Sequence, residues 1–232
     1  MNKVSVLDDK GYVRLVPEGC SGSDLTIVNS ARVSYDKEST ELDGRDERLI
    51  NFLAREGHTS PFRHATLQFE VYAPLMVARQ WWKYVVGSDH TLDAWNESSR
   101  RYVTEDTVNY IPAPDEWRGA PESSKQGSGE PVDRGIGQDL THQLMMHVRD
   151  SEALYERAME LGVCAEQARL FLPAYGMYVR WYWTASLQSV AHLINQRTKP
   201  DAQFEFQEYA HVVKELAKSR FPVAITALTE LK

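Results

Sequence analysis

Polar residues that suit an anionic, hydrogen-bonding ligand are concentrated between Glu97 and Arg101. This run places one carboxylate, two hydroxyls and two guanidiniums in consecutive positions. A guanidinium matches a phosphate through a planar, bidentate fork, whereas carboxylates and hydroxyls suit the polar edge of a ring. The pattern therefore indicates a ligand that carries both groups. A solvated helix start, capped by Asn96 or Ser98, is the competing interpretation.

Two further arginines stand in apolar surroundings, Arg169 in ARLFLP and Arg197 after LINQ. A lone arginine beside apolar residues either anchors an ion pair or binds an anion, and the sequence leaves both open. Tryptophans and tyrosines accompany these segments. Their default role is packing, although flat aromatic side chains also line pockets for planar rings.

Other chemistries find less support in the sequence. His58 and His64 lie beside a proline, but no second set of ligands at metal-binding spacing accompanies them, so no metal is expected. Two cysteines exclude a disulfide framework, and the apolar context of Cys164 is typical of a core thiol. Neither GxSxG nor the common nucleotide-binding loops GxGxxG and GxxxxGK[ST] occur. A bound dinucleotide would have to be held by side chains and helix ends.

Length and charge narrow the class of protein. The chain has 232 residues and a formal net charge of −7, which argues against a surface that coats nucleic acid. The N-terminus lacks the apolar core of a signal peptide, and no apolar run approaches the ~18 residues of a membrane helix. We therefore expect a soluble, cytoplasmic protein.

The elements that must position these side chains alternate without a βαβ rhythm, so the expected class is α+β. A segment over 111–135 holds four prolines and four glycines and is expected to be a surface loop or lid. The expected strands are VSVLD and YVRLV within 3–16, then 65–72 and 177–185. The expected helices are 24–34, 45–56, 75–86, 137–161, 187–197, 200–219 and a short one after Pro222.

Taken together, the polar segments resemble the flavin-dependent thymidylate synthase family (ThyX). The family pattern approximates RQWFRHRxxSxNExSxRY, of which RQW and NExSxRY are intact here. The resemblance spans roughly residues 25–210, and its pieces are specific only in combination. The matching segments are ARVS at 31–34, GHTSPFRH at 57–64, RQW at 79–81, NESSRRY at 96–102, ARLFLP at 168–173, NQR at 195–197 and AQFE at 202–205.

Three departures from the family pattern concern the flavin contacts. The RHR triplet is replaced by Lys83-Tyr84-Val85, and about six extra residues lie between Ser88 and Asn96. A family Asn-x-Arg contact aligns with 186–188, which is Ser-Leu-Gln. Lysine is a point charge and valine offers no side-chain hydrogen bond. Some contacts must therefore differ, and His90 in the insertion is a candidate replacement.

The resemblance implies a fold and an activity. The fold is one mixed α+β domain over residues 1–232, with an antiparallel sheet packed against long helices and the lid at 111–135. The implied enzyme is an FAD-dependent methyltransferase that converts dUMP to dTMP. NADPH reduces the flavin, methylenetetrahydrofolate donates the carbon, and no cysteine adduct is needed. The implied assembly is a homotetramer with sites between subunits.

The resemblance also implies roles for individual residues. Arg197 is the expected catalytic residue, because a guanidinium at the uracil edge would stabilise developing negative charge. The expected dUMP-binding residues are Gln80, Lys83, Glu97, Ser98, Ser99, Arg100, Arg101, Arg169 and Arg197. The expected FAD-binding residues are Ser34, His58, Lys83, Tyr84, Val85, Glu97, Ser186, Gln188 and His192.

Three alternatives stay open on the sequence alone. The Lys83-Tyr84-Val85 replacement would suit a nucleotide-binding homologue that has lost flavin chemistry. An enzyme of the same fold could modify another pyrimidine nucleotide with flavin and folate. A binder of single-stranded nucleic acid, suggested by the aromatic and basic run at 79–85, is disfavoured by the acidic net charge.

Overall fold

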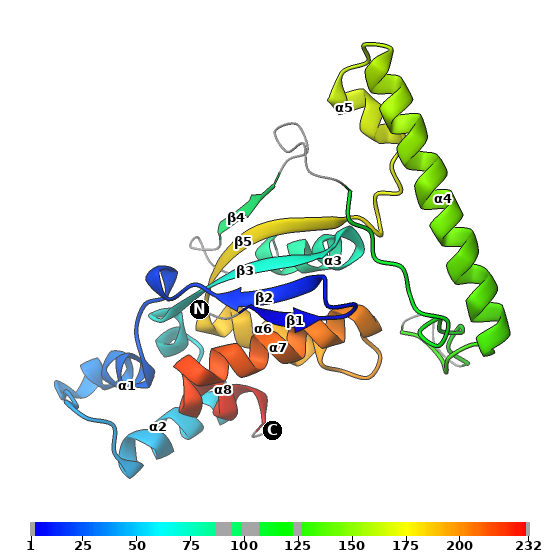
Figure 1. Ribbon diagram of the computed structural model, residues 1–232. Helices are drawn as coiled ribbons and strands as arrows, with labels where there is room; N and C mark the ends of the chain where they lie inside the picture. Colours follow the sequence, from blue (N-terminus) through cyan, green and yellow to red (C-terminus); the bar gives the residue numbers. More distant parts are fainter. Residues whose placement is uncertain (1–2, 87–93, 99–106, 123–126, 231–232) are drawn as a thin grey trace.

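A five-stranded antiparallel sheet forms the centre of the protein, in the order β1-β2-β3-β5-β4 (Figure 1). The computed structural model describes residues 3–86, 94–98, 107–122 and 127–230. The expected α+β class is confirmed, and so are all four expected strands. The strands are β1 (Val4–Val6), β2 (Gly11–Leu15), β3 (Thr66–Pro74), β4 (Ala94–Glu97) and β5 (Tyr178–Ser186).

Strand β4 is the element that the sequence did not predict. It pairs Asn96 with Tyr182 and Glu97 with Trp181 at the edge of the sheet. The Trp95 ring stacks on Trp181 with centroids 4.8 Å apart, and this contact anchors a short edge strand. The helix start considered at Asn96 is therefore wrong, because the backbone is extended there.

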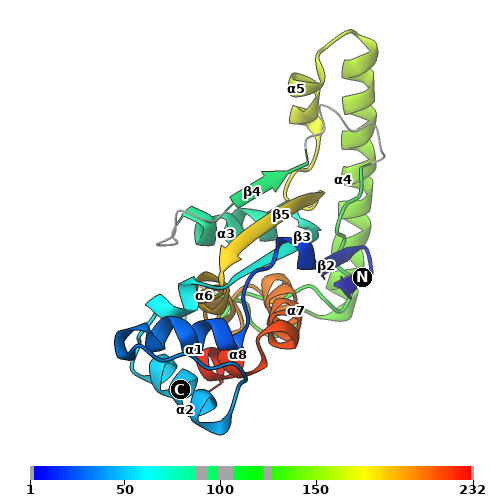
Figure 2. The ribbon, with the colours of Figure 1, turned by 90° about the vertical axis from the view of Figure 1, so that its left-hand side faces the viewer.

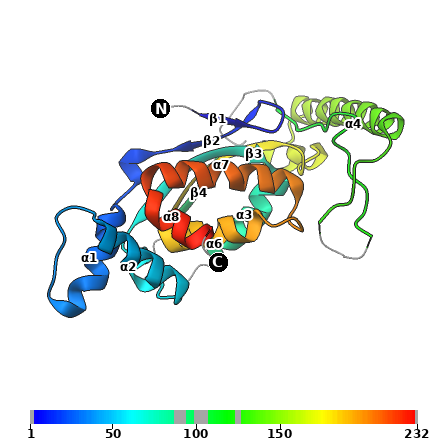
Figure 3. The same cartoon turned by 90° about the horizontal axis from the view of Figure 1, so that it is seen from below.

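The core lies between the sheet and a layer of helices made by α6 (Leu187–Arg197), α7 (Phe204–Arg220) and α8 (Pro222–Thr229) (Figure 3). Alternate residues of β3, namely Leu67, Phe69 and Val71, are fully buried. Burying each such side chain contributes roughly 1.5–3 kcal/mol, so the central strands form the stable part of the molecule.

The remaining helices mostly confirm the sequence-based expectations. They are α1 (Asp24–Arg32), α2 (Gly44–Arg55), α3 (Leu75–Val86), α4 (Arg134–Glu160) and the short α5 (Ala165–Ala168). Helix α4 begins three residues earlier than expected, because the Asp133 carboxylate caps it by accepting from the backbone N–H of Gly135. The expected start of α7 at Pro200 is wrong, since the helix begins at Phe204.

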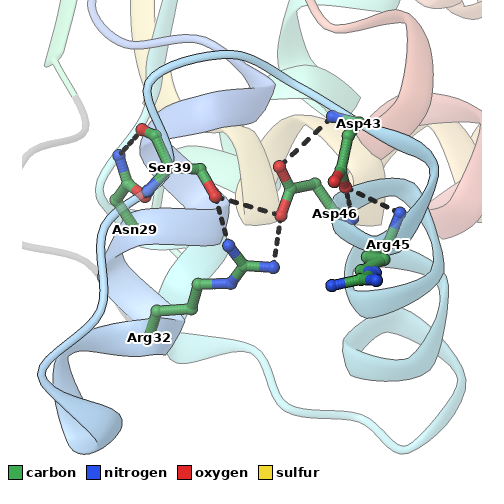
Figure 4. Close-up of polar contacts among 6 residues, drawn as sticks. All are labelled: Asn29, Arg32, Ser39, Asp43, Arg45 and Asp46. Carbon is green, nitrogen blue, oxygen red and sulfur yellow. Dashed lines mark hydrogen bonds and ion pairs between the residues drawn. The ribbon is translucent and has the colours of Figure 1, made fainter.

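The connection between α1 and α2 is tied down by a polar network around Asp46 (Figure 4). Asp46 is only 1% exposed and forms an ion pair with Arg32 at 2.5 Å. Ser39 donates to the same carboxylate at 3.2 Å and exchanges two hydrogen bonds with Asn29. Asp43 caps α2 by accepting hydrogen bonds from backbone N–H groups, and these bonds lower the pKa of its carboxyl. These bonds order the segment that carries Ser34.

Helices α4 and α5 form an arm that projects from the body of the protein (Figures 1 and 2). The arm turns back at Gly162, whose φ of +82° favours glycine. Large apolar side chains on it are exposed, including Leu154 at 53% and Leu170 at 83%. Cys164 is also exposed at the N-cap of α5, so the core-thiol interpretation is wrong. Exposed apolar surface is common where proteins contact other molecules.

The helices within the described ranges are each too short or too polar to cross a membrane.

Candidate functional site

Arg197 lies at the C-terminal end of α6, where it faces helix α3. Its Nε donates to the Tyr84 hydroxyl at 2.6 Å, and one terminal nitrogen donates to Oε1 of Gln80 at 3.0 Å. The guanidinium also lies 5.3 Å from the ring centroids of both Tyr84 and Phe206. Two hydrogen bonds and two cation–π contacts therefore hold one planar cation in a defined orientation.

Gln80 continues this contact toward α7. Its Nε2 donates to Oε1 of Gln203, and Nε2 of Gln203 donates to the Glu205 carboxylate at 2.8 Å. We call Arg197, Tyr84, Gln80, Gln203 and Glu205 the Arg197 cluster. Each of its members is partly buried.

The start of α6 lies beside this cluster. The Tyr84 ring is 5.7 Å from that of His192, which is exposed. Gln188 lies one turn earlier on α6, and its Oε1 is buried without a hydrogen-bond partner in the described part of the chain. Ser186 is fully buried and caps α6 by accepting from the Ser189 N–H at 3.2 Å. Its hydroxyl therefore serves the helix end.

Glu97 lies on the edge strand β4. With Leu75, Ala78, Arg79, Trp82 and Trp95, it lines a hollow of about 180 Å³. Trp95 Nε1 donates to the Glu97 carboxylate at 3.3 Å. Partial burial of the carboxylate raises the pKa of Glu97, although the Trp95 hydrogen bond and the charge of Arg79 act in the opposite direction.

A cavity of about 400 Å³ opens between α4, the start of α7 and the segments 109–118 and 127–128. Gln203 and Glu205 line it, together with aromatic side chains such as Tyr110, Trp117 and Phe204. Burial raises the pKa of the Tyr110 hydroxyl far above its ordinary value, and the charge of Glu205 adds to this shift. Through Gln203 and Glu205, the Arg197 cluster thus borders a cavity with three aromatic side chains in its lining.

Arg169 does not join the Arg197 cluster within one chain. It is exposed in a short 3-10 helix, Arg169–Phe171, and its Nε donates to the carbonyl of Glu166 at 3.2 Å. That helix packs on α4 and α5, and α5 lies at the far end of the arm (Figure 1). Of the apolar neighbours read from the sequence, Leu170 and Phe171 are exposed, whereas Ala168 and Leu172 are buried.

Other residues expected in the site are dispersed or lie outside the described residues. Lys83 is exposed on α3 beside Tyr84. His58 is exposed after α2, with its ring 5.7 Å from that of Phe52. Ser98 follows β4 and exchanges hydrogen bonds with the backbone of Arg180. Ser34 lies just after α1 and Val85 near the end of α3. Outside the described residues lie His90, Ser99, Arg100 and Arg101.

Gln203 and Glu205 have no role predicted from the sequence, although the AQFE segment that contains them matches the family pattern. The available signal was a glutamine immediately before a helix, where a shorter polar residue is the usual cap. The NQR segment also divides in two. Asn195 donates to the Leu228 carbonyl at 2.8 Å and so binds α6 to α8, while Arg197 faces α3.

The described part of the chain contains no group of three or more histidine, cysteine or acidic side chains that could hold a metal ion.

Comparisons with known proteins identify the family. The family model described as thymidylate synthase complementing protein matches residues 15–223. A flavin-dependent thymidylate synthase of Thermotoga neapolitana is 34% identical over 95% of this chain and 91% of its own. One from Thermus thermophilus is 35% identical over 96% and 77%. A solved structure, the UMP/dUMP methylase PolB from Streptomyces cacaoi bound with 5-Br dUMP, is 27% identical, covers 97% of each chain and has a TM-score of 0.82. The chain therefore belongs to the flavin-dependent thymidylate synthase family.

Proposed function

We propose that this protein catalyses the reductive methylation of dUMP to dTMP. The proposal includes methylenetetrahydrofolate as carbon donor, FAD as cofactor and NADPH as the reductant. Its main support is the oriented guanidinium of Arg197, which Tyr84 and Gln80 hold in a family whose named members are flavin-dependent thymidylate synthases. The similarity to a UMP/dUMP methylase supports a uridylate substrate.

Arg197 is the proposed catalytic residue. The uracil ring must become electron-rich at C5 before it can attack carbon, so negative charge develops on its carbonyl and imide atoms. Because Tyr84 and Gln80 use two of the five N–H groups of Arg197, the others can stabilise that charge. Cys164 lies on the arm and Cys20 donates to the Val16 carbonyl, which agrees with a route that needs no cysteine adduct.

The start of α6 fits the flavin ring. The buried Oε1 of Gln188 lacks a partner in the described part of the chain, and an imide N–H of an isoalloxazine is a suitable donor to it. His192 and Tyr84 present aromatic rings nearby. FAD, when bound, supplies the hydride that completes the methyl group. The other proposed flavin contacts are Lys83, Val85, Glu97, Ser34 and His58. Ser186 contributes by capping the start of α6.

The nucleotide phosphate requires cations from elsewhere in the chain. We assign Arg169, Arg101 and Lys83 to it, and Glu97, Ser98, Ser99 and Arg100 to the lining of the nucleotide site. Because Arg169 lies on the arm, a second subunit would supply it, which is why we include a homotetramer in the proposal. The proposal further includes a single domain over residues 1–232, a lid formed by the segment 111–135, and a cytoplasmic location.

Tritium release from ring-labelled dUMP tests the activity directly. The reaction contains the purified protein, FAD, NADPH and methylenetetrahydrofolate, with each component omitted in turn as a control. We expect release of tritium from C5 and formation of dTMP only in the complete mixture. A colourless protein that binds dUMP without releasing tritium would instead be a nucleotide-binding homologue that has lost flavin chemistry.

The named activity of the structural neighbour favours a second candidate substrate, the ribonucleotide UMP. The same assay with ring-labelled UMP and product analysis by mass distinguishes the two. A kcat/KM for UMP above that for dUMP would replace the deoxyribonucleotide in the proposal.

A further inference from the structure

Helix α7 begins in a way that its local sequence does not explain. Its N-cap is Gln203, whose side chain makes no capping hydrogen bond. Serine, threonine, aspartate and asparagine are preferred there because their short side chains reach the first free N–H groups. Gln203 instead uses its side chain to accept from Gln80 on α3 and to donate to the Glu205 side chain. A residue that breaks a local preference in this way usually serves a site rather than the helix.

The hydrogen bonds of the Arg197 cluster all run in one direction. Arg197 donates to Gln80 at 3.0 Å, Gln80 donates to Gln203, and Gln203 donates to Glu205 at 2.8 Å. A guanidinium can only donate and a carboxylate can only accept. The charged residues at the two ends therefore fix which way both amides point, because reversing either one would place two donors or two acceptors together.

This orientation determines what the cluster can offer a ligand. The Gln80 oxygen is engaged by Arg197, and one of its two N–H groups is engaged by Gln203. The groups that remain are the second N–H of Gln80 and the other N–H groups of Arg197, all of them donors. Donors pair with the carbonyl oxygens of uracil and oppose the exocyclic amine of cytosine.

We propose that Gln203 and Glu205 are positioning residues that make the site selective for a uracil base over a cytosine base. This inference rests on the proposed function and deepens it. A site with fixed donors rejects an analogue that presents another donor, because that pair leaves buried polar groups unsatisfied. Loss of the fixed orientation would let the Gln80 amide rotate and present its oxygen to the amine.

The test measures the dissociation constants of dUMP and dCMP by calorimetry, on the FAD-loaded protein. The variants are Gln203→Met, which removes the central amide, and Glu205→Gln, which removes the charged end. Glu208→Gln is the matched control, since it makes the same change at an exposed position of α7 outside the cluster. The ratio of the two dissociation constants separates a positioning role from a general loss of structure, because a loosened fold would weaken the binding of both nucleotides by the same factor.

We expect the preference for dUMP to fall about tenfold in Gln203→Met, the factor that one hydrogen bond provides. A smaller fall is expected in Glu205→Gln, where Gln203 still accepts from Gln80, and none in Glu208→Gln. The kcat for dUMP should also fall more than KM changes. If Gln203→Met does not fold, Glu205→Gln decides alone. An unchanged ratio in the folded variants would overturn the inference, and wild-type protein that binds neither nucleotide would overturn the proposed function itself.

Discussion

The Arg197 cluster and the arm each carry an arginine assigned to the nucleotide, yet their surroundings differ. Arg197 is partly buried and is oriented by Tyr84 and Gln80 of its own chain. Arg169 is exposed, and it is followed by Leu170 and Phe171, which are 83% and 48% exposed. One arginine is ready for a ligand within the subunit, whereas the other lies on a surface suited to a second molecule.

This difference separates two tasks of a charged side chain. A guanidinium that stabilises charge during the reaction must be oriented before the ligand arrives. Tyr84 and Gln80, the partners that orient Arg197, accordingly lie on helix α3 of the same chain. A guanidinium that binds a phosphate only needs to lie within hydrogen-bonding distance of it. In the proposed assembly, the arm brings Arg169 to the nucleotide site of another subunit, and that contact covers the apolar side chains of the arm.

The largest expected effect comes from removing the oriented arginine. Arg197→Ala should lower kcat for methylation by about 10³-fold, in the range observed when a preorganised donor to a developing anion is lost. FAD binding should be nearly unchanged. Tritium release and the flavin absorbance of the purified protein measure the two properties. Turnover close to that of the wild type would remove Arg197 from the catalytic role.

Mixing two inactive variants tests whether the arm acts across subunits. Arg169→Ala should weaken dUMP binding strongly, since a charge-assisted hydrogen bond to phosphate is lost. If Arg169 and Arg197 of different chains share one site, refolded mixtures of the two variants should contain some intact sites and regain tritium release. A mixture no more active than either variant alone would place both arginines in sites formed by a single chain.

Tyr84→Phe should have a smaller effect than Arg197→Ala. The hydroxyl accepts from Arg197 Nε at 2.6 Å, while the ring contacts with that guanidinium and with His192 remain in the variant. Loss of one hydrogen bond should lower kcat about tenfold. Fluorescence titration of FAD provides the control. An increased dissociation constant with normal kcat would show that Tyr84 serves the flavin, as the sequence first indicated.

The elements could be predicted from the sequence because their signals are local. Each signal acts over a few residues: the alternation in β3, Ser23 before α1, Gly57 after α2 and Ser186 before α6. Strand β4 lacked such a signal, because its anchor is the stacking of Trp95 on a tryptophan of a distant strand. Edge strands depend on cross-strand contacts of this kind.

The site was only partly predictable for the same reason. The AQFE segment matched the family pattern without a role for Gln203 or Glu205, and Gln80, the partner of Gln203, lies more than a hundred residues earlier, so no spacing rule connects them. Arg169 appeared to be enclosed by apolar residues in the sequence, and two of those residues, Leu170 and Phe171, are exposed in the folded subunit. A sequence pattern identifies apolar neighbours without showing whether the same chain covers them.

The smallest functional effect is expected in the sheet, where Glu70 is 6% exposed beside β2 and β5. Burial opposes ionisation of this carboxyl. Hydrogen bonds from Tyr12 at 2.6 Å and Arg14 at 2.8 Å, another from Tyr182, and the charge of Arg14 outweigh it and lower the pKa below its ordinary value. Glu70→Gln should therefore lower the free energy of unfolding by about 1–3 kcal/mol at neutral pH, with kcat nearly unchanged.

The pH dependence of this loss follows from the direction of the shift. A carboxyl whose pKa is lower in the folded state stabilises the protein above its unfolded pKa of about 4.3 and loses that contribution as pH falls through the folded value. The difference between the wild type and Glu70→Gln should thus shrink below about pH 4 in urea titrations. Because the partners of Glu70 belong to the same chain, the difference between the two proteins should not vary with protein concentration. A loss of stability caused by weaker contacts of the arm with another subunit should, in contrast, depend on protein concentration. A difference that is constant from neutral to acidic pH would show that Glu70 contributes through packing alone.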